Sequence, residues 1–187
     1  MISSLSTLTI EGATITPALT EGVLEYAAGT YAASGDITAT PTNAGDTAAI
    51  KVNGEALTGD TATWEIGTNS VEITVSGTGH VTQVYTMTVT RKSALSALSL
   101  GAATISPTFD AELFEYTATT SNATNTVTAT ALEETDDVTL VLNDETMTGT
   151  TATWEAGENV LEITVGTGST ATTYTVTVTK TEAESVG

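Results

Sequence analysis

The densest group of potential ligand residues is an acidic run at 133–137, which reads EETDD. Carboxylate oxygens bind calcium. The candidate calcium ligands in this run are Glu133, Glu134, Asp136 and Asp137. A calcium ion needs about six to eight oxygen ligands, and no other run of acids or amides supplies the remainder at recognisable spacing. The pattern therefore favours a solvated acidic loop, with calcium as the alternative, and we predict no metal or other cofactor.

Side chains for catalysis are sparse. His80 is the single histidine of the sequence, and cysteine is absent. A histidine can activate a serine nucleophile, but no G-x-S-x-G turn is present and the serines fall in strand-like or linker segments. Paired carboxylates for glycoside hydrolysis need a cleft, which small domains built of strands rarely form. We therefore predict that the protein is not an enzyme.

Two tryptophans have the same neighbours, in TATWE at 61–65 and again at 151–155. An exposed tryptophan could stack on a sugar ring, but here alanine and tryptophan alternate with threonine and glutamate. That alternation gives an extended segment one apolar and one polar face, so we predict that Trp64 and Trp154 lie in a core. The same reasoning makes four tyrosines structural: Tyr26, Tyr85, Tyr116 and Tyr174.

Each tryptophan is followed by Gly-x-Asn, at 67–69 and at 157–159. Glycine and asparagine both tolerate positive φ, so we interpret these residues as turns between strands rather than as a binding loop. Asn53-Gly54 is a strong signal for a two-residue β-hairpin, and Asn143-Asp144 is a poorer version of it.

The whole sequence is an internal repeat. TATWEIGTNSVEITV at 61–75 returns as TATWEAGENVLEITV at 151–165, an offset of ninety residues. The match extends from the Leu-rich openings to the segments at 85–91 and 174–180, where the offset falls to 89. Ninety residues exceed the roughly 20–50 of solenoid repeats and suit a domain. We predict two domains, 1–91 and 92–187, with a very short joint between them.

Apolar and polar residues alternate with a period of two, as in SVEITVS at 70–76. Turn signals recur between such segments, which is typical of strands packed on one face. In the first repeat we expect strands near 5–10, 13–17, 23–30, 36–42, 48–53, 61–66 together with 70–76, and 82–91. No window has helical spacing with caps. The fold class is therefore all-β, with two tandem antiparallel β-sandwich domains of about seven strands each.

Three segments together carry a family resemblance. The opening LSTLTIEGATITPAL, the central WEIGTNSVEITV and the closing YTMTVTR resemble the cadherin-like β-sandwich domain of bacterial surface proteins, and the second repeat resembles it equally. The resemblance implies an immunoglobulin-like sandwich used as a spacer or display module. Similar modules also occur on phage capsids and tails. The interdomain calcium motifs of true cadherins are absent from this sequence.

The charge is strongly unbalanced. Acidic residues number 23 and the net charge is −19, because only four residues are basic: Lys51, Arg91, Lys92 and Lys180. Such a chain repels nucleic-acid phosphates and anionic lipid. No segment approaches the roughly 20 apolar residues that cross a bilayer, so we expect neither nucleic-acid binding nor membrane insertion. Signal-peptide and anchor patterns are missing, which fits either a whole protein that is not secreted by a removable signal or a piece of a longer one.

These features predict a non-catalytic structural or display protein. Its tandem sandwiches would decorate a larger assembly, first of all a phage capsid or tail, with a protein partner on the virion surface. The alternative is a spacer, adhesion or carbohydrate-binding module of an extracellular bacterial cell-surface protein, whose ligand would be a protein or a surface glycan.

Overall fold

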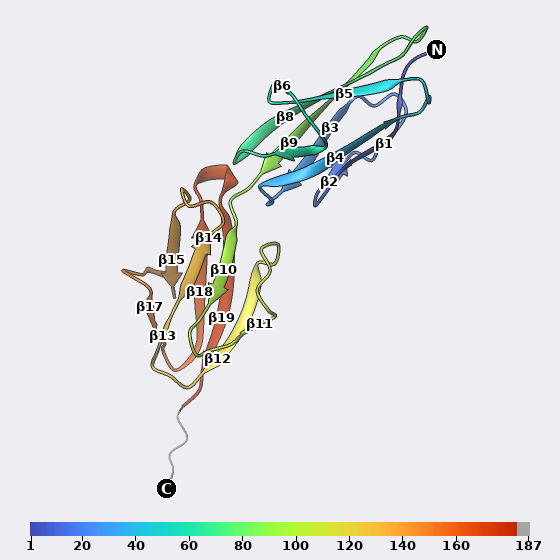
Figure 1. Cartoon of the computed structure of the whole chain (residues 1–187). Helices are drawn as coiled ribbons and strands as arrows, with labels where there is room; N and C mark the ends of the chain where they lie inside the picture. Colours follow the sequence, from blue (N-terminus) through green and yellow to red (C-terminus); the bar gives the residue numbers. More distant parts are fainter. Residues whose placement is uncertain (183–187) are drawn as a thin grey trace. The chain divides into compact units, whose positions relative to one another are not determined.

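The computed structural model describes residues 1–182. The chain divides into two compact units, Met1–Lys92 and a second unit that begins at Ser93, and strands dominate both (Figure 1). The described residues contain a single helical segment, the three-residue 3-10 helix η1 (Gly168–Thr170). Within this part of the chain no helix has the length and apolar character needed to span a membrane.

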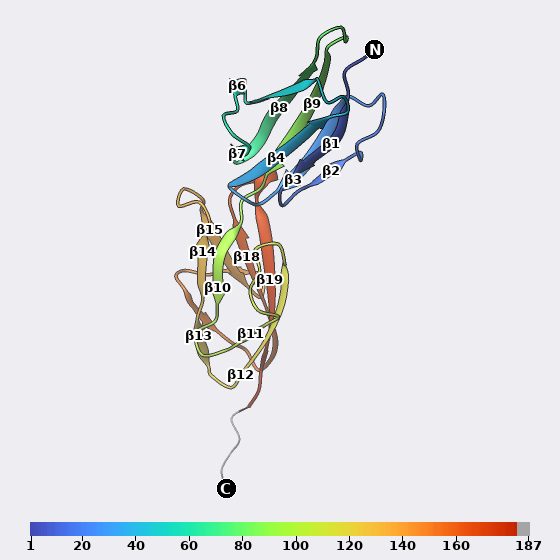
Figure 2. The same cartoon turned by 45° about the vertical axis from the view of Figure 1, so that its right-hand side comes forward.

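Domain one, Met1–Lys92, is a sandwich of two sheets. The larger sheet has the order β2-β3-β9-β8-β5-β6, and the smaller has the order β1-β4-β7 (Figure 2). The strands are β1 (Leu5–Ile10), β2 (Thr14–Thr16), β3 (Glu25–Thr30), β4 (Ser34–Pro41), β5 (Thr47–Val52), β6 (Glu55–Ala56), β7 (Thr61–Thr63), β8 (Gly67–Ser76) and β9 (Gln83–Arg91).

Domain two repeats this arrangement. Its larger sheet has the order β11-β12-β19-β18-β15-β16, and the facing layer consists of the pairs β10-β14 and β13-β17. The strands are β10 (Leu95–Ser99), β11 (Ile105–Ser106), β12 (Glu115–Thr120), β13 (Thr124–Thr126), β14 (Thr128–Ala131), β15 (Val138–Leu142), β16 (Glu145–Thr146), β17 (Thr151–Thr153), β18 (Gly157–Val165) and β19 (Thr172–Lys180).

Strand β8 illustrates why these segments form half-buried strands. Val71 and Ile73 are buried, whereas Glu72 between them is exposed. Across the sheet, Ile73 pairs with Ile50 on one side and with Tyr85 on the other, so apolar side chains line up on the core face. Full burial of such a side chain stabilises the fold by about 1.5–3 kcal/mol. Alternation therefore fixes which face of each strand turns inward.

The predicted all-β fold with two tandem sandwiches is confirmed. The structure adds β6, a two-residue strand too short to show alternation in sequence. It also pairs β3 with β9, and β12 with β19, in parallel, whereas every other strand pair among residues 1–182 is antiparallel. No hairpin joins β3 to β9, because other strands intervene in the chain, so local turn geometry does not force them to be antiparallel.

The two predicted hairpin turns are also confirmed. Asn53 and Gly54 join β5 to β6 with φ of 50° and 86°, and Asn143 and Asp144 join β15 to β16 with φ of 48° and 66°. Positive φ at both central residues is the geometry that matches the twist of a two-residue β-hairpin.

Candidate functional site

The acidic run that the sequence singles out lies in the loop between β14 and β15. The Asp136 amide donates a hydrogen bond to the Glu133 carbonyl over 3.0 Å, while Glu134 and Asp137 are exposed. Over residues 1–182, no three histidine, aspartate or glutamate side chains lie close enough together to hold a metal ion. The four candidate calcium ligands therefore share one loop without converging on a common point.

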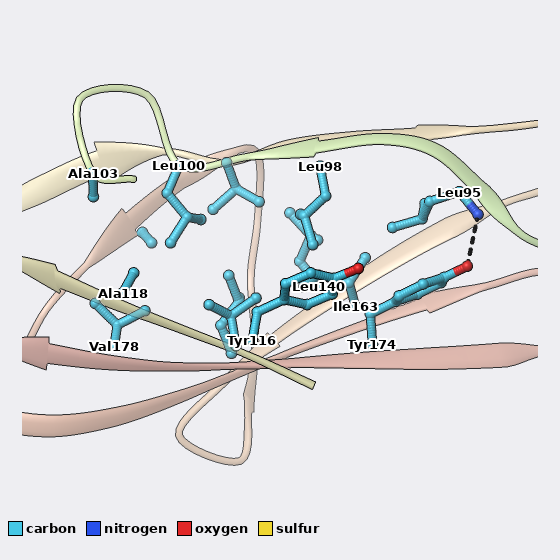
Figure 3. Close-up of a cluster of buried hydrophobic side chains, with 14 of the residues drawn as sticks. Leu95, Leu98, Leu100, Ala103, Tyr116, Ala118, Leu140, Ile163, Tyr174 and Val178 are labelled. Atoms are coloured by element: carbon cyan, nitrogen blue, oxygen red, sulfur yellow. Dashed lines mark hydrogen bonds between the residues drawn. The ribbon is translucent and has the colours of Figure 1, made fainter. Parts of the chain in front are cut away.

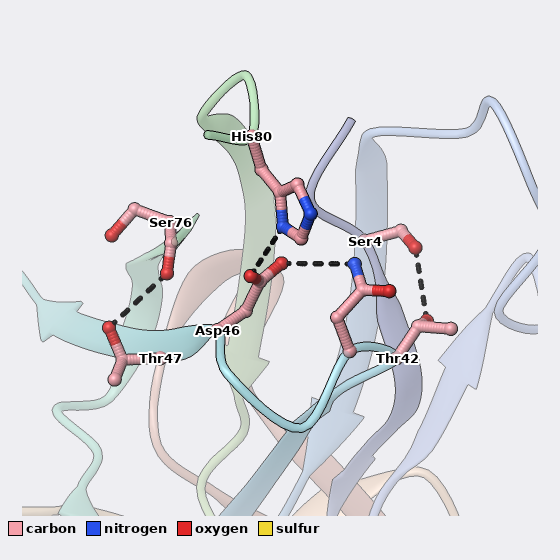
Figure 4. A network of polar contacts seen from close by, with 7 residues as sticks. Ser4, Thr42, Asp46, Thr47, Ser76 and His80 are labelled. Carbon is pink, nitrogen blue, oxygen red and sulfur yellow. Dashed lines mark hydrogen bonds and ion pairs between the residues drawn. The ribbon is translucent and has the colours of Figure 1, made fainter. Parts of the chain in front are cut away.

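A polar cluster that the sequence did not predict lies at one end of domain one (Figure 4). His80 Nδ1 lies 2.7 Å from Asp46 Oδ1, and Asn43 Nδ2 donates a hydrogen bond of 3.2 Å to Asp46 Oδ2. The Asp46 side chain is 1% exposed and the His80 side chain is 23% exposed. Gly77 fits against the carboxylate so closely that a Cβ there would collide with it. The pair fastens the loop before β9 to the loop before β5.

The electrostatics of this cluster centre on Asp46. Burial raises the pKa of its carboxyl, but the polar side chains of Ser3, His80 and Asn43 and the charge of His80 outweigh that effect, so the pKa lies below its ordinary value. The folded domain thus favours the carboxylate over the carboxylic acid. The unbonded side of the histidine ring makes no hydrogen bond to a serine hydroxyl among residues 1–182, so the described geometry does not assemble a hydrolytic triad.

Both tryptophans are buried, as the alternation predicts: Trp64 is 1% exposed and Trp154 is 3% exposed. Their indoles differ in bonding. Trp154 Nε1 donates to Asn125 Oδ1 over 2.8 Å, whereas Trp64 Nε1 finds no acceptor among residues 1–182. Gly35 stands where domain two has Asn125, ninety residues later. Neither indole face is available as a platform for a sugar.

The Gly-x-Asn motif is only half as predicted. Gly67 and Gly157 have φ of 100° and 92°, as a turn requires. Asn69 and Asn159, however, lie within β8 and β18, are buried, and are not among the residues with positive φ. The interpretation of these asparagines as turn residues is therefore wrong. Burial demands hydrogen bonds for an amide side chain, and this need explains their position.

Each of these asparagines holds its tryptophan hairpin closed. Asn69 Oδ1 accepts the Glu65 amide over 2.9 Å and Asn53 Nδ2 over 3.0 Å, and Asn69 Nδ2 donates to the Glu65 carbonyl over 2.8 Å. Asn159 makes the same bonds to Glu155 and Asn143. The repeated motif is therefore a structural clamp, in which the amide joins the hairpin turn at 53–54 or 143–144 to the chain that follows the tryptophan.

Domain one carries a groove of about 840 Å³. Its lining includes Leu5, Leu19, Leu24, Gln83 and Tyr85. Among the lining side chains a single one, that of Glu21, is charged. Most ligand sites are concave and combine apolar side chains with a few placed polar groups. This groove is mixed, because serine, threonine, glutamate and glutamine side chains line it beside the leucines and Tyr85. The sequence held a usable signal for it, because domain two has phenylalanine at both positions that correspond to the groove's leucines 19 and 24.

Comparison with known proteins identifies the repeat unit. A family model described as cadherin-like beta sandwich domain matches residues 5–92 and again residues 95–181. Domains of this kind are typically extracellular or surface modules for adhesion or structure, without catalytic activity, and such modules generally mediate protein interactions. Among curated proteins, none matches the chain.

Solved structures that are similar to the chain are also tandem modules. The fibronectin(III)-like modules of Clostridium thermocellum CbhA are 12% identical, with 95% of each chain covered and a TM-score of 0.28. The Ig1-2 module of the Drosophila receptor protein tyrosine phosphatase DLAR is 6% identical, with 97% and 100% covered and a TM-score of 0.31. The titin fragment I67–I69 is 5% identical, with a TM-score of 0.28; 80% of this chain matches 59% of it. At these low TM-scores, membership in a family is shown by the family model alone.

Proposed function

Because the chain belongs to the cadherin-like β-sandwich domain family over both of its repeats, we propose that it is a non-catalytic display protein. In this proposal its tandem sandwiches decorate a larger assembly through contact with a protein, and that assembly is the surface of a phage virion, on its capsid or tail. The observation that carries the proposal is the burial of the repeated motif in both domains. Because the repeated motif lies in the core, contact with a partner must involve the outer surface of the domains.

The charge of the chain favours attachment to a protein surface. The net charge of −19 opposes adsorption to anionic lipid or to nucleic acid, whereas a protein shell can offer an apolar, hydrogen-bonding or basic docking patch. The second candidate is a spacer or adhesion module on a bacterial cell surface. A glycan partner gains no support from the tryptophans, because both indoles are buried.

Locating the native protein tests this proposal. Antibody labelling of purified virions and of intact cells from the source, viewed by electron microscopy, is expected to mark the particles. Labelling of the cell surface alone would establish the second candidate instead. Labelling confined to the interior of permeabilised cells would contradict both.

A further inference from the structure

The two domains have different side chains at the positions that line the groove of domain one. Ninety residues after Leu19 and Leu24, which line the groove, domain two has Phe109 and Phe114. Both phenylalanines pack against the core of domain two. In domain one Leu19 also packs against the core, but Leu24 is 36% exposed, so the copies differ in packing at the second position. One fold thus carries the larger ring in one copy and the smaller aliphatic side chain in the other.

The phenylalanines of domain two stack around Tyr174. The ring centroid of Phe114 lies 5.5 Å from that of Tyr174, and Phe109 lies 6.2 Å from Tyr174 and 6.1 Å from Tyr116. Figure 3 shows the two tyrosines side by side in this core. Offset and tilted aromatic pairs at such distances contribute about 0.5–1.5 kcal/mol each beyond the area they bury. The tyrosine pair of domain one, Tyr26 and Tyr85, has no phenylalanine at either of these positions.

The tyrosine hydroxyl differs in the same way. In domain two, Tyr174 Oη accepts the Leu95 amide over 3.2 Å and donates to the Ala111 carbonyl over 2.7 Å (Figure 3 draws the first bond). In domain one, Tyr85 Oη accepts the Leu5 amide over 3.2 Å, and its hydroxyl donates to no carbonyl among residues 1–182. Tyr85 lines the groove although it is 6% exposed, and within the described chain its O–H lacks the main-chain carbonyl that Tyr174 has in domain two.

We propose that the groove lined by Leu5, Leu19, Leu24 and Tyr85 binds an aromatic side chain of a basic polypeptide segment. The ring takes the place that phenylalanine takes in domain two. A main-chain carbonyl of the same segment accepts the Tyr85 O–H, as the Ala111 carbonyl accepts Tyr174. Basic residues beside the ring complement Glu21 and the net charge of −19, which would repel an acidic segment or a second copy of this chain.

This inference names the partner chemistry of the proposed display function and rests on that function. The tests remain separable. Labelling of virions and cells reports where the protein is, whereas peptide binding to the purified protein reports whether the groove accepts an aromatic side chain.

The binding test uses three short peptides that differ in one feature each. The first carries phenylalanine between lysines, the second replaces phenylalanine with alanine, and the third replaces the lysines with glutamates. Two-dimensional NMR of the isotopically labelled protein follows the amide signals. We expect the first peptide to shift the signals of Leu5, Leu19, Leu24 and Tyr85. The other two peptides should bind at least about ten-fold more weakly, a difference of roughly 1.4 kcal/mol.

A variant that fills the groove gives the matched control. The double substitution Leu19→Phe and Leu24→Phe installs the residues of domain two, and we expect it to abolish peptide binding while the domain stays folded. Leu24→Phe alone serves if the double variant fails to fold. Val160→Phe adds the same ring to an exposed position of domain two and should leave binding unchanged.

Three results would overturn the inference. One is the absence of shifts at millimolar concentrations of the first peptide. Another is an equal response to the phenylalanine and alanine peptides. The last is undiminished binding to the folded, groove-filled variant.

Discussion

Asn159 has the largest predicted effect of any single polar residue in domain two. It is 1% exposed. Its side chain forms hydrogen bonds with the backbone N–H and C=O of Glu155 and with the side-chain amide of Asn143. Asn159→Ala removes the side-chain partner of each of these groups, which costs about 1–3 kcal/mol for each group that water cannot reach. We expect a loss of about 2–4 kcal/mol in the free energy of unfolding of domain two, measured by chemical denaturation.

The matched control is Asn122→Ala, since Asn122 is an exposed residue of the same domain. A change within about 0.5 kcal/mol is expected there. If Asn159→Ala cost no more than this control, the description of the asparagine as a clamp would be wrong.

Asn125 supports the tryptophan of domain two. Its side chain accepts from Trp154 Nε1 and Thr120 Oγ1 and donates to the Leu100 carbonyl over 3.0 Å. Asn125→Ala should therefore destabilise domain two by about 2–3 kcal/mol. Domain one should not gain from the reverse change, because a Cβ at Gly35 would lie 2.8 Å from the Glu11 carbonyl oxygen. Thermal unfolding of Gly35→Asn tests this expectation, and a higher melting temperature of domain one would contradict it.

Asp46 gives domain one a dependence on pH. Its pKa is lower in the folded domain than its ordinary value, so the unfolded chain takes up a proton first on acidification. The stabilisation is complete at pH values above the ordinary aspartate pKa of about 4. It is lost as the pH falls through the lower pKa that Asp46 has in the folded domain. The stability advantage of the native protein over Asp46→Asn should therefore shrink in acid.

Denaturation of both proteins over a series of pH values measures this advantage. Asp60→Asn, at an exposed position, is the control for general charge effects of the acidic chain. An advantage over Asp46→Asn that stays constant from neutral to acid pH, or that grows in acid, would show that the cluster does not favour the carboxylate.

At the scale of elements, the hairpin between β15 and β16 carries a local strain that its counterpart avoids. Asp144 has φ of 66°, where domain one has Gly54. Glycine adopts positive φ without steric cost, so Asp144→Gly should stabilise domain two by about 0.5–1 kcal/mol. The exchange Gly54→Asp should destabilise domain one by a similar amount. Urea denaturation of the two variants should show opposite shifts, and shifts of the same sign would be inconsistent with this reasoning.

The elements were predictable because their signals are local. Alternation in SVEITVS, the Asn53-Gly54 turn and the ninety-residue offset each report on residues that are close in the chain or copied within it. Burial of Trp64 followed from its alanine neighbour two positions earlier. These inferences needed no knowledge of which strands lie side by side.

The sites were less predictable because they depend on contacts distant in the chain. Asp46 and His80 are 34 residues apart, and the parallel pairing of β3 with β9 brings together segments from opposite ends of the domain. Asn69 was assigned to a turn from its residue type, but burial and the need for hydrogen bonds determined its place. The groove required a comparison between leucine in one copy and phenylalanine in the other.

At the scale of the whole chain, charge and burial together direct attention to the surface. Residues 1–92 contain nine acidic and three basic residues, and residues 93–187 contain 14 acidic and one basic residue. Such self-repulsion favours solubility and opposes association with other acidic surfaces. The motif that both copies share is buried in the cores. Contacts with a partner must therefore use loops, outer strand faces or the groove of domain one.

The repeated tryptophans lie buried in the two cores, where a sugar ring cannot stack on them. Acrylamide quenching of tryptophan fluorescence in the whole chain tests this claim most directly, because the sequence contains Trp64 and Trp154 alone. We predict blue-shifted emission that resists quenching in the native protein and becomes fully quenchable in denaturant. Native emission that is quenched as readily as that of the unfolded chain, or that changes on adding a glycan, would contradict the claim.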